Sequence, residues 1–191
     1  EYVMRIITVT GYKPMEMNIF KPSDHKISFI KEAIKKRLVS LIEEGLEWIL
    51  VSGQMGVELW TCEVIQDLKQ EYEIQIGIIP PFEGQDERWP EHYQLSFEEM
   101  TMCADFFKPL YQGGYKGPFQ FKARDKWLIE KSDGCLLLLD EEFPGSTSFF
   151  LEAAKAQNER SHYPILTITP FDLEETVHEL IEQDPNYWGN D

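Results

Sequence analysis

Short runs of consecutive apolar residues alternate with longer amphipathic segments along this chain. Unbroken apolar runs are typical of strands buried on both faces of a parallel sheet. Apolar residues that recur every three or four positions are typical of helices packed on such a sheet. The runs predict strands at residues 5–10, 48–51, 74–79, 105–108, 134–139 and 165–169. The amphipathic segments predict helices at residues 26–44, 57–71, 91–102, 119–131, 147–157 and 171–181.

This alternation predicts an α/β fold of three layers, with a mostly parallel sheet between helices on both faces. The length of 191 residues suits a single domain, residues 1–191, and the chain shows no internal repeat. Gly11 is expected to end the first strand, and Asp24 and Gly45 to cap the first helix at its two ends. The last residues, 184–191, are expected to form a fraying tail.

Ligands of such folds bind outside the carboxyl ends of the strands, where the strand order reverses. Four turns follow predicted strands and are therefore candidates for a binding site. They are residues 11–14, 52–58, 80–82 and 140–147.

The turn after the second strand is the strongest of these candidates. Its sequence, SGQMGVE from Ser52 to Glu58, leads from an apolar strand into a helix. Unpaired N–H groups and the positive end of the helix dipole favour an anion at such a point. Gly53 and Gly56 lack a Cβ, so a phosphate or ribose could approach the backbone closely. We therefore expect Ser52, Gly53, Gln54 and Gly56 to contact a nucleotide, although any turn of a parallel sheet favours small residues.

Glu58 and Lys13 have two interpretations each, and Tyr12 has one. Glu58 lies in the first helical turn, where the dipole stabilises a carboxylate, or it could accept hydrogen bonds from ribose hydroxyls. Lys13 could bind the phosphate or be an ordinary surface lysine. Tyr12 could stack on a base, next to Gly11 in the first turn.

Aromatic and basic residues further along the chain offer more contacts. The loop at residues 82–90 is long enough to act as a lid, and Phe82 and Trp89 could clamp a base or simply cover apolar surface. The stretch PFQFKARDKW at residues 118–127 places Gln120 and Lys122 in the densest basic patch of the chain. This patch could bind a ligand or a partner, or form a solvated helix face.

Composition excludes several classes of function. The net charge is −16, from 34 acidic and 18 basic residues, which argues against a nucleic-acid partner. No apolar run is long enough to span a membrane, and the first residues do not resemble a signal peptide. Three scattered cysteines have neither metal-ligand spacing nor the even count of a disulfide framework. A cytoplasmic protein without a metal site is expected, and its exposed-looking aromatic residues are compatible with a homodimer.

Several motifs, in order, resemble the YpsA family of Gram-positive bacteria. They are TGYKP, SGQMGVELWTCE, PFQFK and KSDGCLLLLD, and the resemblance extends from Met4 to about Leu173. That family is placed in the SLOG superfamily of Rossmann-like proteins, with DprA and the LOG phosphoribohydrolases. The resemblance implies a Rossmann-like fold and nucleotide binding at the glycine turn, through Gly11, Ser52, Gly53, Gly56 and Glu58. Members of the family have also been connected with cell division.

The LOG enzymes carry PGGxGTxxE before a helix, with the glutamate as a catalytic residue. The corresponding stretch here is PGSTSFFLE, in which Gly145 and Glu152 match but serines and Phe149 replace the later glycines and the threonine. Glu152 is therefore only a weak catalytic candidate. Ser146 and Thr147 could still cap the helix and contact a phosphate, together with Gly145.

The leading hypothesis is a sensor-like or regulatory protein that binds a nucleotide, NAD or ADP-ribose, with no cofactor that the residues alone identify. A hydrolase of nucleotide N-glycosidic bonds, with Glu152 or Glu58 stabilising the reacting centre, is the first alternative. A scaffold whose acidic surface binds a protein partner is the second.

Overall fold

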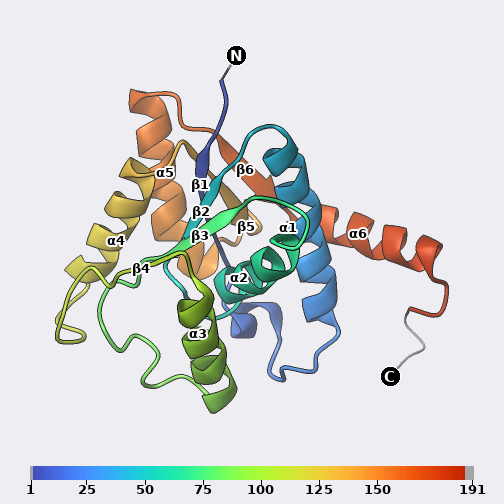
Figure 1. Cartoon of the computed structure of the whole chain (residues 1–191), viewed down its shortest axis with the longest axis horizontal. Coiled ribbons are helices and arrows are strands. Elements are labelled where there is room, and N and C mark those ends of the chain that lie inside the picture. The colour runs from blue at the N-terminus through green and yellow to red at the C-terminus, as the bar shows by residue number, and fades with distance from the viewer. Residues whose placement is uncertain (1, 188–191) are drawn as a thin grey trace.

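A single six-stranded sheet forms the centre of the molecule in the computed structural model, which describes residues 2–187 (Figure 1). All of its neighbouring strands pair in parallel, in the order β4-β3-β2-β1-β5-β6. The strands are β1 (Ile6–Gly11), β2 (Trp48–Val51), β3 (Gln75–Ile78), β4 (Phe106–Phe107), β5 (Gly134–Leu138) and β6 (Ile165–Ile168). The prediction of a mostly parallel α/β sheet is confirmed.

The strand order reverses beside β1. From β1 the chain adds β2, β3 and β4 on one side and then returns to place β5 and β6 on the other. β1 is paired with β5 from Ile7–Gly134 to Gly11–Leu138. The carboxyl ends of β1, β2 and β5 consequently meet at the position where α/β folds bind ligands.

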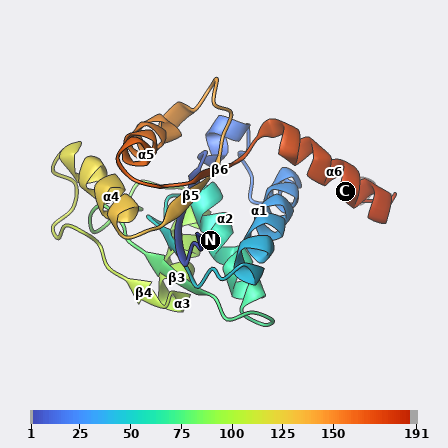
Figure 2. The same ribbon diagram turned by 90° about the horizontal axis from the view of Figure 1, so that it is seen from above.

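Helices cover both faces of the sheet, as predicted (Figure 2). One face carries α1 (Lys26–Glu43), α2 (Val57–Leu68), α3 (Glu91–Cys103) and α6 (Pro170–Gln183), and the other carries α4 (Phe119–Glu130) and α5 (Ser148–Arg160). Two short 3₁₀ helices, η1 (Pro14–Met17) and η2 (Gly145–Thr147), were not anticipated. η1 follows β1, and η2 lies between β5 and α5, so both lie close to the point where the strand order reverses.

The apolar runs in the sequence correspond to strands buried on both faces. Along β5, Leu136 packs in the cluster beneath α1 and α2, whereas Cys135 and Leu137 pack in the cluster beneath α4 and α5. Alternate side chains of a strand point to opposite faces, so a strand covered on both sides must be apolar throughout. This is why β5 has no polar residue.

The caps of α1 lie one residue from those predicted, at His25 and Glu44. The Asp24 carboxylate nevertheless accepts a hydrogen bond from the Lys26 amide at 2.9 Å, and Gly45 follows the helix with φ of +118°. Gly11 ends β1 as expected, as the last paired residue of that strand. Its missing Cβ lets the strand lie against Val57 of α2 and the Leu138 carbonyl.

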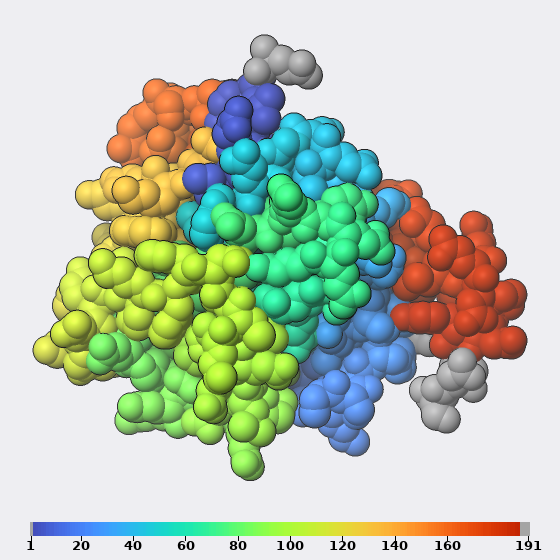
Figure 3. Space-filling model, viewed as in Figure 1, coloured from blue at the N-terminus to red at the C-terminus, as the bar shows by residue number. Residues whose placement is uncertain are grey.

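Figure 3 shows that the segment around β4, in yellow-green, and α6, in red, lie on opposite sides of the molecule. Phe106 and Phe107 of β4, at the sheet edge, are 41% and 45% exposed. None of the helices in residues 2–187 is long and apolar enough to cross a bilayer. The expected tail at 184–191 is described only as far as Tyr187, and the rest lies outside the described residues.

Candidate functional site

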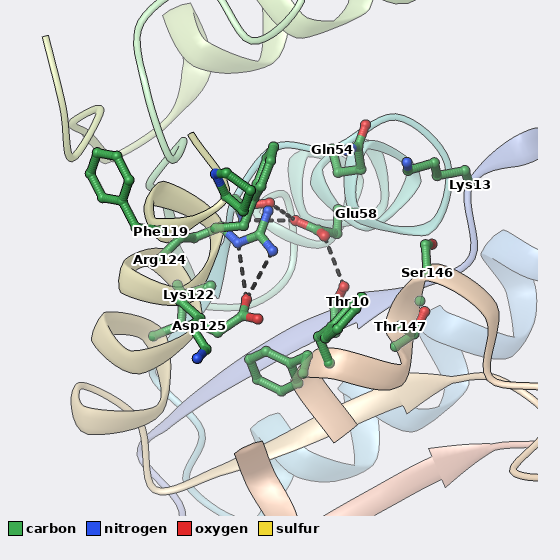
Figure 4. A pocket seen from close by; sticks show the side chains of 17 residues that line it. Thr10, Lys13, Gln54, Glu58, Phe119, Lys122, Arg124, Asp125, Ser146 and Thr147 are labelled. Carbon is green, nitrogen blue, oxygen red and sulfur yellow. Dashed lines mark hydrogen bonds and ion pairs between the residues drawn. The ribbon is translucent and has the colours of Figure 1, made fainter. Parts of the chain in front are cut away.

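A cavity of about 580 Å³ opens at the carboxyl ends of β1 and β2, between α4 on one side and η2 with α5 on the other (Figure 4). Its size falls within the usual range for small-molecule sites. The lining residues come from four segments of the chain. They are Thr10, Gly11 and Lys13; Ser52, Gln54 and Glu58; Pro118, Phe119, Phe121, Lys122, Arg124, Asp125 and Leu128; and Ser146, Thr147, Phe149 and Phe150.

Glu58 is the central polar residue of this cavity, and it is only 6% exposed. Its Oε1 accepts hydrogen bonds from the Ser52 amide at 2.7 Å, the Ser52 hydroxyl at 2.8 Å and the Gly53 amide at 3.1 Å. Its Oε2 accepts one from the Thr10 hydroxyl at 2.8 Å. The Ser52 and Gly53 amides, which were expected to bind a phosphate, therefore donate to the carboxylate of Glu58 instead.

The two glycines of the turn accommodate protein atoms rather than a ligand. A Cβ on Gly53, where φ is +84°, would lie 2.9 Å from Ile78 and from Phe97 in the core. One on Gly56, where φ is +96°, would lie 2.5 Å from the Tyr12 carbonyl oxygen. Neither glycine lines the cavity, so the structure gives no support to the expectation that they admit a ligand to the backbone.

Lys13, Gln54, Ser146 and Thr147 lie at one end of the cavity (Figure 4). Thr147 is 3% exposed, and its hydroxyl has no hydrogen-bond partner in residues 2–187. A buried hydroxyl without a partner costs free energy, which makes it a natural contact for a ligand.

Glu16 of η1 joins this end of the site to η2. Its carboxylate accepts hydrogen bonds from the Ser146 amide at 2.9 Å, the Ser146 hydroxyl at 2.5 Å and the Lys13 amide at 2.9 Å. It also lies beside Gly145, where φ is +55°. Glu16 therefore holds the segment before α5 against the turn after β1.

We predict that Glu16 makes stability depend on pH. Partial burial opposes ionisation, but the Ser146 and Lys13 hydrogen bonds and the Lys13 charge together lower the pKa of Glu16. A lowered carboxyl pKa contributes stability above the unfolded-state pKa, and this contribution is lost as pH falls through the lowered value. Urea unfolding from about pH 6 to about pH 3 should therefore show a shallower decline for Glu16→Gln than for the unmodified chain. Parallel declines would contradict this role.

α4 forms the opposite end of the cavity, where Asp125 is 6% exposed. Its Oδ1 accepts a hydrogen bond from Nε of Arg124 at 3.0 Å and forms an ion pair with Nη2 of the same guanidinium, also at 3.0 Å. The Arg124 guanidinium also lies 5.4 Å from the centre of the Phe121 ring. Burial raises the pKa of Asp125, and the charge of Glu58 adds to this effect, while Arg124 opposes it. Two carboxylates, those of Glu58 and Asp125, therefore face one cavity. They differ in their surroundings, because Glu58 accepts hydrogen bonds from amides and hydroxyls whereas Asp125 pairs with a guanidinium.

The structure brings eight of the predicted ligand-binding residues together at the cavity. They are Gly11, Lys13, Ser52, Gln54, Glu58, Lys122, Ser146 and Thr147. The others lie outside its lining, and so does the weak catalytic candidate. They are Tyr12, Gly53, Gly56, Phe82, Gln120, Gly145 and Glu152.

The residues outside the lining have contacts of their own. The Tyr12 hydroxyl accepts from the Asp140 amide at 2.8 Å and donates to the Phe143 carbonyl at 2.5 Å. Phe82 packs edge-on against Tyr115 and Phe121. These side chains thus support the walls of the cavity rather than line it.

Gln120 and Glu152 also differ from expectation. Gln120 is fully buried, accepts from the Lys116 amide at 2.7 Å and donates to the Gly114 carbonyl at 3.0 Å. Glu152 has an exposed side chain 3.8 Å from Lys155. A role for Glu152 in chemistry at this cavity is therefore not supported.

Sequence reasoning did not select Thr10, Asp125 or the apolar wall. Asp125 was visible as an acidic residue inside a basic stretch, and this contrast is the signal that could have found it. Phe149 was noted only as a departure from the LOG motif and Phe150 was not singled out, yet both line the cavity. Among residues 2–187, no group of three or more His, Cys, Asp or Glu side chains could hold a metal ion.

Comparison with known proteins agrees with this architecture. DNA processing protein A (DprA) from Streptococcus pneumoniae has a similar fold, with a TM-score of 0.50 and 14% identity, over 95% of this chain and 57% of the DprA chain. UPF0398 protein OB1025 of Oceanobacillus iheyensis is 57% identical over 185 residues, which is 97% of this chain and all of that protein. UPF0398 protein YpsA of Bacillus subtilis is 44% identical over 177 residues, covering 92% and 98% of the two chains.

A family model described as the YspA SLOG family, YpsA, matches residues 7–173. The match includes every residue that lines the cavity. The chain therefore belongs to the YpsA family of SLOG proteins.

Proposed function

We propose that this protein binds a nucleotide or a nucleotide derivative of the ADP-ribose or NAD type in the cavity between α4 and α5, and that it acts as a sensor or regulator. The observation that carries the proposal is the division of one cavity into two chemically different ends. Phe119 and Phe121 of α4 line one end, and a lysine, an amide and a hydroxyl with no partner in residues 2–187 gather at the other. A nucleotide has the same division between its base and its phosphate.

The phosphate is placed beside Lys13, Gln54 and Thr147. Lysine supplies a positive charge, and the Thr147 hydroxyl supplies a donor that no protein group uses. Within residues 2–187, the amides of Gln54 and Glu58 also donate to no protein acceptor. The Glu58 amide belongs to the first turn of α2, where the helix dipole favours an anion, and Gln54 lies in the turn that precedes this helix.

The ribose is placed near Glu58. Oε1 of this carboxylate already accepts three hydrogen bonds, but Oε2 accepts only one. A carboxylate oxygen can accept more than one hydrogen bond, so Oε2 retains capacity for a sugar hydroxyl. In this proposal both interpretations of Glu58 hold, because Oε1 stabilises the turn and Oε2 accepts a hydrogen bond from the ribose.

A thermal-shift screen tests the proposal. A ligand at about 100 times its dissociation constant adds about 2.7 kcal/mol of stability. For a chain of this size the midpoint should rise by roughly 5–11 °C. The panel should contain AMP, GMP, ATP, NAD and ADP-ribose, and we expect at least one member to produce this rise.

Two variants and one control link the shift to the cavity. Thr147→Val removes the unpartnered hydroxyl with little change of shape, and Lys13→Met removes the charge; both should reduce the shift. Lys126→Met is the matched control, because Lys126 is exposed, does not line the cavity and, among residues 2–187, pairs only with Glu130, at 3.9 Å. A flat screen, or a shift that both cavity variants retain, would remove support for nucleotide binding and favour a scaffold that binds a protein partner.

A further inference from the structure

We propose that the cavity selects guanine among the nucleobases, through the carboxylate of Asp125 and the guanidinium of Arg124 on α4. This inference rests on the proposed nucleotide-binding function and adds the identity of the base. It assigns a role to a buried ion pair that the phosphate and ribose contacts leave unused.

The position of Asp125 points to contact with a base. It lies at the end of the cavity away from Lys13 and Thr147 (Figure 4), on the helix that also contributes Phe119, Phe121 and Leu128 to the lining. Aromatic side chains are the usual stacking surfaces for bases, and a ring seated between them presents its polar edge to the wall. The polar side chains of α4 that line the cavity are those of Lys122, Arg124 and Asp125, and Asp125 is the one that supplies acceptors.

The Asp125 carboxylate has unused acceptor capacity in a buried place. The hydrogen bond from Arg124 Nε and the ion pair with Nη2 both involve Oδ1. Oδ2 has no donor among the described residues, although the residue is only 6% exposed. A buried carboxylate is stabilised by further N–H donors, and a ligand that supplies them gains charge-assisted hydrogen bonds.

The edges of the bases differ in what they offer to a carboxylate. Guanine presents two adjacent donors, N1–H and the 2-amino group, with the O6 acceptor beside them. Adenine and cytosine each present one amino donor next to a ring nitrogen that accepts, and this lone pair would face the carboxylate. Uracil presents one N–H between two carbonyl oxygens. Guanine is therefore the only one of these bases that offers two adjacent donors to a carboxylate.

Arg124 completes the complementarity. Its guanidinium is fixed by Asp125 and by the Phe121 ring, and Nη1 has no acceptor among the described residues. A fixed donor next to the carboxylate corresponds to the O6 acceptor next to the two guanine donors. The pair thus presents an acceptor and a donor side by side.

The test is isothermal titration of the full chain with GMP, IMP, XMP and AMP. GMP should bind most tightly. IMP lacks the 2-amino group and should bind roughly 10- to 150-fold more weakly, the equivalent of one hydrogen bond to a charged group. XMP has a carbonyl in place of that amino group and should be rejected at least as strongly.

Asp125→Asn sharpens the test, because an amide offers one donor and one acceptor. This variant should lose affinity for GMP and gain affinity for XMP, so that the preference reverses. Glu130→Gln is the matched control on α4, since Glu130 is exposed and lies outside the cavity, and it should leave all four affinities unchanged. If Asp125→Asn fails to fold, the comparison of GMP with IMP in the unmodified chain still decides whether the cavity recognises the 2-amino group of guanine.

Three outcomes would overturn the inference. Equal affinity for GMP and IMP, or tighter binding of AMP, would exclude guanine selection while the proposed nucleotide binding stands. An equal loss for all four ligands in Asp125→Asn would assign Asp125 to the shared ribose or phosphate. Binding of none of them, together with a flat screen of the wider panel, would remove the proposed function itself.

Discussion

Glu58→Ala should destabilise the protein by about 3–6 kcal/mol, because it leaves several buried donors without an acceptor and each costs about 1–3 kcal/mol. The Ser52 and Gly53 amides and the hydroxyls of Ser52 and Thr10 all donate to this carboxylate. The hydroxyls can rotate toward other acceptors, whereas the amides are held by the turn. For a chain of this size the unfolding midpoint should fall by roughly 6–24 °C.

Glu58→Gln is the matched control for this prediction. The amide oxygen of glutamine can replace Oε1 as the acceptor for Ser52 and Gly53, and its NH₂ group can donate to the Thr10 hydroxyl. We expect a loss of only about 1–2 kcal/mol, the usual scale for weakening one hydrogen bond. Urea unfolding of both variants measures the difference. Equal stability of Glu58→Ala and the unmodified chain would show that solvent satisfies the turn and that Glu58 is not its structural acceptor.

Gly53→Ala should be the second most damaging change, at about 2–5 kcal/mol. The left-handed φ of +84° costs an alanine roughly 1–2 kcal/mol. The added Cβ would also lie 2.9 Å from Ile78 and from Phe97, and such overpacking costs about 1–3 kcal/mol more. Gly53 is therefore a structural glycine, and a variant at this position does not separate loss of ligand binding from loss of the fold.

Gly113→Ala separates the two contributions, because Gly113 has the same φ of +84°. The nearest atoms to its added Cβ are the end of the Lys116 side chain, 3.6 Å away, which is ordinary contact. This control should cost only about 1–2 kcal/mol, the strain alone. Chemical unfolding of the two variants gives the packing contribution as their difference. Equal losses would show that Ile78 and Phe97 move aside at no cost.

The sequence motifs predicted the location of the site better than its chemistry. Glu58 shows the difference clearly, since its place in the first turn of α2 suggested a carboxylate near a ligand. Only the folded chain shows that this carboxylate binds the Ser52 and Gly53 amides itself. Either a side chain or a phosphate could accept the hydrogen bonds of these amides. The choice depends on distances across the folded turn, and the spacing of residues along the chain does not give those distances.

The sequence by itself determined that this protein has a central sheet covered by helices on both faces. Runs such as the one from Gly134 to Leu138 must be buried on both faces, and the helical spacing between the runs supplies the covering helices. The resemblance of TGYKP and SGQMGVE to the YpsA family likewise identified the family and the edge of the sheet that carries the cavity. These properties follow from local periodicity and from short motifs, which the chain displays directly.

The tertiary structure alone decided which side chains share the cavity. It placed Asp125 opposite Thr147, turned Glu152 into solvent, and filled the space beside Gly53 with Ile78 and Phe97. Each of these outcomes depends on how a helix is rotated and docked against strands distant in sequence. One residue of rotation changes which helical side chain faces a cavity, so the contents of the site could not be predicted before the packing of α4 and α5 was known.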